Sequence, residues 1–557
     1  MISTKSLQWK RILPLIRCQT RDAGGTIPEG PKNEPVLDYS DPNSGHRQEL
    51  ERRLHELQGQ TQEVPIVIRG KRYKTDAIRH QLVPFDHARK LTRFYYATHE
   101  LIRQATKAAL EAKEEWNQVP IGQRLALFER AAELVSGKYR QRLNAATIMG
   151  QAKTMKQAEI DSAAEFADFL RFNAHFMRYL LEWQPNSTEF ETNVMELRAL
   201  DGFVAAISPF NFTAIGANLA SAPTLMGNCV IWKPSDAAIL SNYVALELFE
   251  EAGFPEGVIN FVPSEGLDFG RLMTGNKKLG GVNFTGSLAT FQWLWSEIGL
   301  NIKRYESFPR LVGECGGKNF HLIHRSAHLD IAIAQTIRSA FEYSGQKCSA
   351  CSRLYVPASL WSSVKDRLVH IAERELKVGP ATDHSVYTSA VIDSNAYNRI
   401  TNYINFAKAS ERDLKLLCGG TASNETGYFV QPTIFETTNP RNRLMVEEIF
   451  GPVLTVFVYP DSRVDETLDL IDENLFALTG AIFSQDDKFI EHAKRKLRMS
   501  AGNLYINDKS TGAVVGQQPF GGSKLSGTND KAGGPHHLMR WCSQQTVKRT
   551  TRNMVEF

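Results

Sequence analysis

The stretch that decides the fold is Gly202–Phe212, which reads Gly-Phe-Val-Ala-Ala-Ile-Ser-Pro-Phe-Asn-Phe. Its first six residues form an apolar run that ends at Ser-Pro, and this pattern predicts a buried strand followed by a loop. Similar runs predict strands at Cys229–Trp232, Val258–Val262 and Gly281–Asn283, alternating with helices at Asp236–Gly253 and Phe291–Leu300. The alternation predicts parallel strands joined by crossover helices, an α/β fold with a doubly wound sheet.

A second series of apolar runs predicts a second α/β unit, joined to the first near residue 313. Its strands are predicted at Asn319–Ile323, Ser352–Val356, Val453–Val458 and Asn503–Ile506. Upstream of both units the pattern turns helical from Gln48. A further helix is predicted over 154–182, where Glu165 lies among apolar neighbours.

Length and composition predict two or three domains with large buried cores. Apolar residues make up 42% and charged residues 23% of the 557 residues, as in an ordinary soluble protein. Seven cysteines in this length do not make a disulfide scaffold and indicate a reducing compartment. No run of about 18 apolar residues occurs, so no membrane span is expected.

The amino terminus differs from the rest, because residues 1–21 contain five basic residues and no acidic one. With apolar residues between 12 and 16, this pattern predicts a mitochondrial transit peptide over 1–24; a disordered basic tail is the alternative. Removing residues 1–24 changes the formal charge from +4 to zero. The remaining chain has no excess of positive charge, so no nucleic-acid binding is expected.

The candidate nucleophile is Cys348, in the run Glu-Tyr-Ser-Gly-Gln-Lys-Cys-Ser-Ala-Cys at Glu342–Cys351. Its polar neighbours predict a thiol near solvent, where a cation or a backbone N–H favours the thiolate. Glu314 lies 34 residues earlier in a glycine-rich segment, and a thiol with a candidate base indicates covalent catalysis on a carbonyl.

Cys348 and Cys351 also form a C-x-x-C motif, which is typical of a redox pair or half a zinc site. The zinc interpretation lacks a second pair of ligands at the required spacing, so no metal site is predicted. The redox interpretation lacks a compact thioredoxin-sized context but stays open as an alternative.

Three strand-to-loop transitions are candidate binding positions. Phe284–Ser287 ends a predicted strand and precedes a helix, where backbone N–H groups bind phosphate, although the usual G-x-G-x-x-G motif is absent. Lys233 ends another strand and could bind a ribose, and Asn211 follows Gly202–Ile207 and could donate to an oxyanion. Taken alone, each is also typical of a turn or a surface position.

Seven segments occur together, in this order, in one family, and on them residues 50–545 resemble the NAD(P)-dependent aldehyde dehydrogenases. The segments are Ser208–Phe212, Trp232–Ser235, Phe284–Ser287, Glu314–Lys318, Gly345–Cys348, Glu447–Pro452 and Pro519–Gly522. Phe341–Pro357, Ser510–Gly522 and Gly527–Pro535 are similar to one branch of the family, the mitochondrial delta-1-pyrroline-5-carboxylate (L-glutamate 5-semialdehyde) dehydrogenases.

The resemblance implies the aldehyde dehydrogenase fold, with a Rossmann-like NAD-binding domain, an α/β catalytic domain and a small β oligomerisation flap. It places the NAD-binding domain at 25–312, with an oligomerisation hairpin near 186–202, and the catalytic domain at 313–525. A C-terminal oligomerisation segment follows at 526–557, with a strand near 543–550. The implied assembly is a homodimer or a larger homo-oligomer built by strand exchange.

The resemblance also implies roles for single residues. Cys348 would attack the aldehyde carbon, the Asn211 amide and the Cys348 N–H would hold the oxyanion, and Glu314 would activate the hydrolytic water. The implied NAD contacts are Ser208, Lys233, Gly286, Ser287, Leu288, Ala289, Thr290, Glu447, Glu448 and Phe450. Which of Glu447 and Glu448 holds the nicotinamide ribose stays open, and NAD rather than NADP rests on the branch alone.

The implied substrate pocket offers anion donors, an aromatic wall and one acid, at Glu165, Phe212, Ser349, Gly512, Ala513 and Phe520. The branch often has Ser where Ala513 stands, and Cys315 stands where Leu or Thr is common. The implied function is NAD-dependent oxidation of L-glutamate 5-semialdehyde to L-glutamate, the second step of proline degradation, in the mitochondrial matrix. The alternatives are a dehydrogenase for another small acidic semialdehyde, such as succinate semialdehyde, or a catalytically silent binding or structural protein on this fold.

Overall fold

The chain divides into two compact units, Met1–Lys32 and Asn33–Phe557. The computed structural model describes residues 30–410 and 412–551. The predicted transit peptide, 1–24, therefore lies outside the described residues. Within the described ranges, no helix is both long and apolar enough to cross a membrane.

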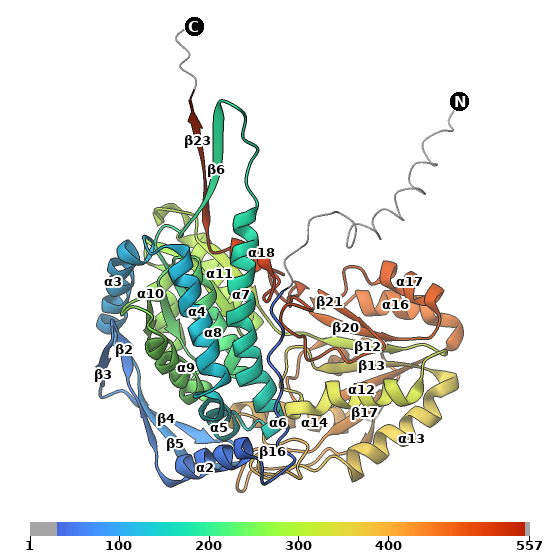
Figure 1. Ribbon diagram of the computed structural model, residues 1–557. Helices are drawn as coiled ribbons and strands as arrows, with labels where there is room; N and C mark the ends of the chain where they lie inside the picture. Colours follow the sequence, from blue (N-terminus) through green and yellow to red (C-terminus); the bar gives the residue numbers. More distant parts are fainter. Residues whose placement is uncertain (1–29, 411, 552–557) are drawn as a thin grey trace, which may run out of the picture. The chain divides into compact units, whose positions relative to one another are not determined.

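A seven-stranded sheet dominates the first half of the unit Asn33–Phe557 (Figure 1). Five of its strands are parallel, β7 Phe203–Ile207, β8 Val230–Lys233, β9 Ile259–Phe261, β10 Leu279–Thr285 and β11 Arg310–Glu314. They lie in the spatial order β11-β10-β7-β8-β9, so the order reverses between β7 and β10. Doubly wound sheets bind ligands at such a point. The four strands predicted here are confirmed, and β11 adds a fifth.

The segment after Gln48 is only partly helical, and the expectation that helix continues from there is wrong. Helix α2 (Gly45–Gly59) gives way to strands, of which β2 (Ile66–Ile68) and β3 (Lys71–Tyr73) extend the first sheet. A separate three-stranded sheet contains β1 (Gln62–Val64), β4 (Ile78–Val83) and β5 (Asp86–Tyr95). These strands are short or carry charged side chains on an exposed face, so their apolar pattern is weak.

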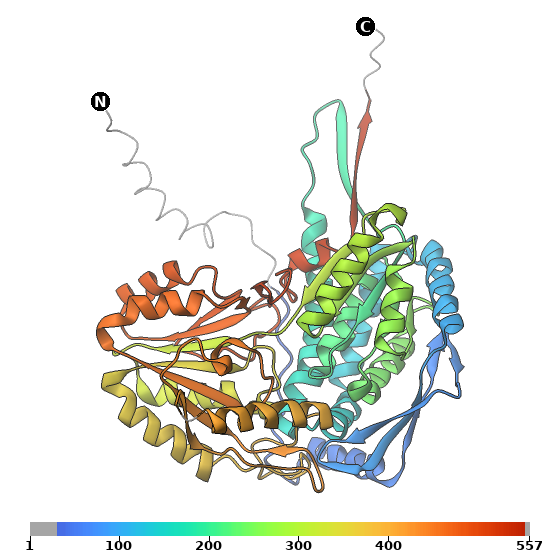
Figure 2. The same ribbon diagram turned by 180° about the vertical axis from the view of Figure 1, so that it is seen from behind.

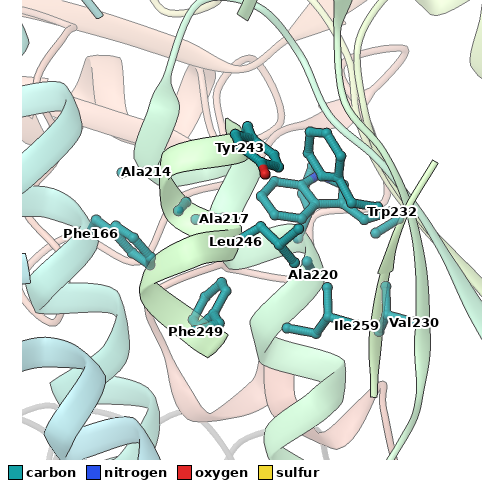
Figure 3. Close-up of a cluster of buried hydrophobic side chains, with 14 of the residues drawn as sticks. Phe166, Ala214, Ala217, Ala220, Val230, Trp232, Tyr243, Leu246, Phe249 and Ile259 are labelled. Atoms are coloured by element: carbon teal, nitrogen blue, oxygen red, sulfur yellow. The ribbon is translucent and has the colours of Figure 1, made fainter. Parts of the chain in front are cut away.

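Helices cover both faces of the first sheet. On one face lie α8 (Thr213–Leu225) and α9 (Ile239–Ala252), beneath α4 (Ile121–Ser136), α5 (Arg140–Gln151) and α7 (Glu165–Glu182). On the other face lie α3 (His99–Trp116), α10 (Gly266–Thr274) and α11 (Leu288–Leu300). Figure 3 shows Trp232 and Ile259 of the sheet facing Leu246 and Phe249 of α9, with Phe166 beyond them. Each such buried side chain contributes about 1.5–3 kcal/mol.

A π-helical turn, Glu159–Ala164, interrupts the helix predicted over 154–182. It separates α6 (Met155–Ala158) from α7, whose first residue is Glu165. Such turns are frequent at functional sites, because they shift the side chains that follow them around the helix axis.

The second sheet has the order β14-β17-β18-β13-β12-β20-β21, and every strand except β14 is parallel to its neighbours. The strands are β12 Asn319–Ile323, β13 Cys351–Pro357, β14 Leu414–Cys418, β17 Thr433–Thr437, β18 Val453–Tyr459, β20 Thr479–Phe483 and β21 Asn503–Ile506. One face packs against α12 (Leu329–Phe341) and α13 (Ala358–Arg374), and the other against α16 (Val464–Asp472) and α17 (Asp487–Lys496). The four predicted strands are confirmed; β14, β17 and β20 add three more.

Short elements join these parts. They are α14 Ser394–Ala409, β15 Ala422–Ser423, β16 Phe429–Val430, α15 Arg443–Val446, β19 Phe476–Ala477, β22 Ser523–Lys524 and α18 Pro535–Met539. After β22 the chain returns to the first sheet, where Gly527 bridges Glu314 and Thr528 N–H donates to the Gly313 carbonyl at 2.9 Å.

A two-stranded ribbon extends away from both sheets (Figures 1 and 2). It pairs β6 (Glu191–Arg198) antiparallel with β23 (Ser543–Thr550), so the predicted C-terminal strand is confirmed. Of the hairpin predicted near 186–202, only β6 is a regular strand: residues 183–190 form no strand but fold back beside it, with Ser187 bonded to Asn193 and Gln184 to Met195, and β6 pairs with β23. Local sequence cannot show a pairing between segments so far apart.

Candidate active site

A cavity of about 260 Å³ lies where loops from both sheets meet. Cys348 and Glu314 line it, as do all six residues predicted to contact the substrate, Glu165, Phe212, Ser349, Gly512, Ala513 and Phe520. The structure therefore brings the thiol, the carboxylate and the predicted substrate contacts to one place.

The chain reaches Cys348 through a left-handed turn. The φ angles of Tyr343, Ser344 and Gly345 are 53°, 53° and 65°. This conformation costs about 1–2 kcal/mol for each non-glycine residue, and Ser344 N–H is held there by Thr388 Oγ1 at 2.7 Å. A Cβ at position 345 would lie 2.3 Å from a backbone carbonyl oxygen, so this position requires glycine.

Cys348 and Glu314 are in contact. The Cys348 thiol donates a hydrogen bond to Oε1 of Glu314, with Sγ 3.5 Å from the oxygen. Burial, helped by the adjacent carboxylate, raises the pKa of the Cys348 thiol well above its usual value. Burial also raises the pKa of Glu314 to about 7. Near neutral pH the carboxyl group is therefore partly ionised, and its ionised form can act as a base toward the protonated thiol.

The expectation of a solvent-exposed thiolate is wrong, since Cys348 is only 8% exposed. The polar neighbours that indicated exposure are themselves buried and hydrogen-bonded. Gln346 Oε1 accepts from Ile392 N–H at 2.9 Å, and Lys347 Nζ donates to Gln157 Oε1 at 2.5 Å. Glu314 likewise ends strand β11 and does not lie in a free loop.

Asn211 lies beside the nucleophile segment. Its Nδ2 donates to the Gln346 carbonyl at 3.1 Å, and the residue is 4% exposed. An amide nitrogen carries two hydrogens, so one hydrogen bond leaves a second donor. Asn211 is therefore held by Gln346, two residues before Cys348 in the chain, and its amide keeps one hydrogen free to donate.

The predicted phosphate contacts gather at the start of α11, next to the point where the strand order reverses. Ser287 is the N-cap of α11 and accepts from Thr290 N–H at 3.3 Å. Ser287 is exposed, as are Ala289 and Thr290, while Gly286 and Leu288 are partly buried. Backbone N–H groups at such a terminus attract anions.

Two other predicted cofactor contacts lie at neighbouring strand ends of the same sheet. Ser208 follows β7, and its hydroxyl already accepts from Trp232 Nε1 at 2.6 Å. Lys233 ends β8, where burial lowers the pKa of its ammonium group. The structure thus brings the strand ends and the α11 terminus to one edge of the sheet.

The adjacent acids Glu447 and Glu448 have opposite surroundings. Glu447 is exposed and accepts from Tyr403 Oη at 2.5 Å and Arg443 Nε at 2.8 Å. Glu448 faces inward, where its Oε1 accepts from Gly317 N–H at 2.8 Å and burial raises its pKa to about 7. Only Glu448 turns toward the segment that follows Glu314.

Phe450 has a φ of 55° and packs edge-on against Phe210, with ring centroids 5.8 Å apart. A bulky residue in this conformation is strained, and such strain clusters at functional sites.

The far end of the cavity combines N–H donors with acids. Gly512 has a φ of 75°, and the described part of the chain contains no acceptor bonded to the N–H of Gly512 or Ala513. On the facing helix, Glu165 has a buried oxygen with no hydrogen-bond partner in the described residues. Burial, followed by nearby Asp161, raises the pKa of Glu165 well above its usual value.

A buried ionic cluster behind Phe212 escaped the sequence predictions. Lys153 is fully buried, pairs with Asp161, and lies 4.0 Å from the Phe212 ring centroid and 4.4 Å from that of Tyr343. Burial lowers the pKa of Lys153 to about 8. Lys153 lies before α6 in no helix, and Asp161 lies within the π-turn, so the pair has no regular helical spacing that could have revealed it.

The other cysteines near the site are free and buried. Cys351 begins β13, and its Sγ is 3.5 Å from the Arg353 carbonyl oxygen, away from the cavity lining. Burial, followed by Glu314, raises the pKa of Cys315 to about 12. Neither thiol is activated as a nucleophile.

Comparison with known proteins gives close matches along almost the whole chain. The delta-1-pyrroline-5-carboxylate dehydrogenase, mitochondrial, of Mus musculus is 51% identical over 527 residues, covering 94% of this chain and 93% of the relative. The Homo sapiens protein of the same name is 50% identical, with the same coverage. A crystal structure of the Delta-pyrroline-5-carboxylate dehydrogenase from Mycobacterium tuberculosis, bound with NAD, superposes with a TM-score of 0.91 at 44% identity, covering 96% of this chain and 98% of that one.

The aldehyde dehydrogenase family model matches residues 75–547, most of the chain. The motifs quoted from the sequence, the five parallel strands of the first sheet and the whole second sheet fall within this range. The chain belongs to the aldehyde dehydrogenase family.

Proposed function

We propose that this protein oxidises L-glutamate 5-semialdehyde to L-glutamate with NAD, the second step of proline degradation. The observation that carries the proposal is the cavity that joins the Cys348–Glu314 pair to unpaired N–H groups and an acidic wall. The names of the relatives in mouse and human support the same substrate.

The residues around the strand reversal fit NAD. A helix N-terminus with an exposed Ser287 suits a pyrophosphate, and Lys233 at the end of β8 suits a ribose. Of the two candidate acids, Glu448 is the better partner for the nicotinamide ribose, because Glu447 is already bound to Tyr403 and Arg443. When bound, NAD supplies the acceptor for the hydride that leaves the substrate carbon.

The reaction begins with proton transfer within the Cys348–Glu314 pair. Glu314 Oε1 accepts the thiol proton, and the resulting thiolate sulfur forms a bond to the aldehyde carbon. The carbonyl oxygen becomes an oxyanion, which the free hydrogen of the Asn211 amide and the Cys348 N–H stabilise. Loss of hydride from this thiohemiacetal leaves a thioester on Cys348.

Hydrolysis of the thioester uses Glu314 again, after its carboxyl group has released the thiol proton to solvent. The carboxylate removes a proton from water, the oxygen attacks the thioester carbon, and the carbon–sulfur bond breaks to release glutamate. With a pKa of about 7, Glu314 is near the optimum for a general base at neutral pH.

The other end of the cavity suits an amino acid. The N–H groups of Gly512 and Ala513 offer a nest for the carboxylate, and Glu165 offers a partner for the ammonium group. Phe212 and Phe520 line the wall between them, beside the aliphatic chain. Because Ala513 lacks the hydroxyl common in the branch, carboxylate binding rests on the backbone donors and on Ser349.

We propose the mitochondrial matrix as the location, with residues 1–24 as the transit peptide, because the relatives are named mitochondrial and the amino terminus is basic and acid-free. We assign NAD binding to 25–312 and catalysis to 313–525. The projecting β6–β23 ribbon and the segment from 526 onward then mediate a homo-oligomer, at least a dimer.

The test is an absorbance assay of NADH formation with pyrroline carboxylate and with succinate semialdehyde, each with NAD and NADP. We expect the highest kcat/KM with pyrroline carboxylate and NAD. A preference for succinate semialdehyde would reject the substrate assignment, and no turnover of any aldehyde would reject catalysis.

A further inference from the structure

The side chain of Asn33 joins two parts of the molecule that line the cavity, helix α7 and the loop 510–518. Its Nδ2 donates to Asp168 Oδ2 of α7 at 2.8 Å and to the Val515 carbonyl at 2.9 Å. Its Oδ1 accepts from Gln517 Nε2 at 2.8 Å. Val515 and Gln517 belong to the loop 510–518, which also contains Gly512 and Ala513. One amide thus ties this loop to the helix on the opposite side of the cavity.

Asn33 is itself held by its neighbour, Glu34. The Glu34 N–H donates to Asp168 Oδ1 at 2.7 Å, so Asp168 binds two consecutive residues of the segment 33–43, the arm that precedes α2. The Glu34 carboxylate, 9% exposed, accepts from Arg140 Nη1 at 2.5 Å and from Ser136 Oγ at 2.9 Å. These charge-assisted hydrogen bonds fix the arm at Glu34, and Tyr39, 6% exposed, packs into the core farther along it.

The loop 510–518 has few other ties to α7. Its internal hydrogen bonds run from Val514 N–H to Gln518 Oε1 at 2.9 Å and from Gln517 N–H to the Val514 carbonyl at 3.0 Å. Gly516 packs on Phe172 of α7 and its N–H donates to the Gly533 carbonyl at 3.2 Å, while Ser510 Oγ donates to the Ser349 carbonyl at 3.0 Å. Among the described residues, the hydrogen bonds that join the loop to the arm come from the Asn33 amide.

We infer that Asn33 is a positioning residue for the substrate carboxylate, acting through the loop 510–518; the inference rests on the proposed function. Both Nδ2 hydrogens are already used, so Asn33 has no N–H left to donate to the substrate directly. Its role is to hold the N–H groups of Gly512 and Ala513 where a carboxylate can reach both. Asn33 therefore contributes to selection of acidic aldehydes over neutral ones.

The experiment compares two five-carbon aldehydes, glutamate semialdehyde and pentanal, which lacks the carboxylate and the amine. For Asn33→Ala we expect the KM for glutamate semialdehyde to rise about tenfold with kcat within about twofold, since one set of hydrogen bonds to the loop is lost. The kcat/KM for pentanal should stay within about twofold, because pentanal does not use the loop's N–H groups. A merely structural role would lower activity toward both aldehydes.

Asn43→Ala is the matched control, because Asn43 is an exposed asparagine farther along the same arm. It should leave both aldehydes unchanged. Gln517→Ala removes one of the three hydrogen bonds from an exposed side chain, so it keeps the test available should Asn33→Ala fail to fold. We expect a rise of about threefold in the KM for glutamate semialdehyde from Gln517→Ala and none for pentanal.

The outcomes separate the inference from the proposed function. A wild-type protein without preference for glutamate semialdehyde over pentanal would reject the proposed function and the inference with it. A wild-type preference that Asn33→Ala and Gln517→Ala both retain in full, or equal losses on the two aldehydes, would reject the inference alone.

Discussion

The functional groups at the two ends of the cavity differ in whether they titrate and in how deeply they are buried. At the reaction end, Cys348 and Glu314 are ionisable groups in contact, and burial raises the pKa of both. At the anchoring end, Gly512 and Ala513 present backbone N–H groups, which do not titrate. Burial raises proton affinity at the reaction end, whereas the donors of the anchoring end belong to an exposed Gly512 and a partly buried Ala513. Changes at the reaction end should therefore affect kcat, and changes at the anchoring end should affect KM.

The largest effect is expected at the sulfur. Cys348→Ala removes the atom that bonds to the substrate, so oxidation should fall by roughly 10⁴-fold or more while the Kd for NAD stays within about twofold. Steady-state NADH formation and a fluorescence titration with NAD measure the two quantities. Substantial residual turnover would show that Cys348 is not the nucleophile. It would also reject the division of the cavity into a reaction end and an anchoring end.

Glu314→Gln should separate the two chemical steps. The glutamine cannot remove a proton from water, so thioester hydrolysis should slow by about 10²–10⁴-fold. Stopped-flow absorbance should then show a burst of NADH followed by a slow phase. An unchanged steady rate would assign the base to another group.

The pH dependence sharpens the assignment of the base. Glu314 has a pKa raised to about 7, so it is protonated and unable to accept a proton below that value. We expect kcat to fall about tenfold per pH unit below pH 7 and to level off above it.

Glu448 is the control for this profile, because burial raises its pKa to about 7 as well. In Glu448→Gln, kcat should still fall below pH 7. If this fall disappears in Glu448→Gln and persists in Glu314→Gln, the titrating base is Glu448.

The smallest effect is expected at the second thiol of the C-x-x-C motif. Cys351 lies in β13 against the Arg353 carbonyl and does not line the cavity. Cys351→Ala should leave kcat and KM within about twofold. A loss comparable to that of Cys348→Ala would instead favour a required redox pair.

Much of the fold could be predicted from the sequence, and the failures have local causes. The buried parallel strands β7, β8 and β18 are largely apolar runs, so they stand out. Strands β3, β4 and β5 carry charged side chains on their exposed faces, so the sequence pattern after Gln48 predicts helix there. The ribbon was missed because β6 finds its partner at the other end of the chain.

The site shows the same division. Family motifs were enough to predict that Cys348, Glu314 and the six proposed substrate contacts line one cavity, although Asn211 is not part of its lining. They could not predict the protonation state of Cys348, because polar neighbours such as Gln346 and Lys347 turn out to be buried. Nor could they predict Asn33, whose role depends on a hydrogen bond to a loop 482 positions away in the sequence.

The most direct test of the account is mass spectrometry of Glu314→Gln protein quenched after reaction with pyrroline carboxylate and NAD. The account predicts one glutamyl group, bound as a thioester on the peptide that contains Cys348 and absent when Cys348 is also replaced by Ala. An NADH burst with no adduct on that peptide, or with the adduct on another residue, would contradict it.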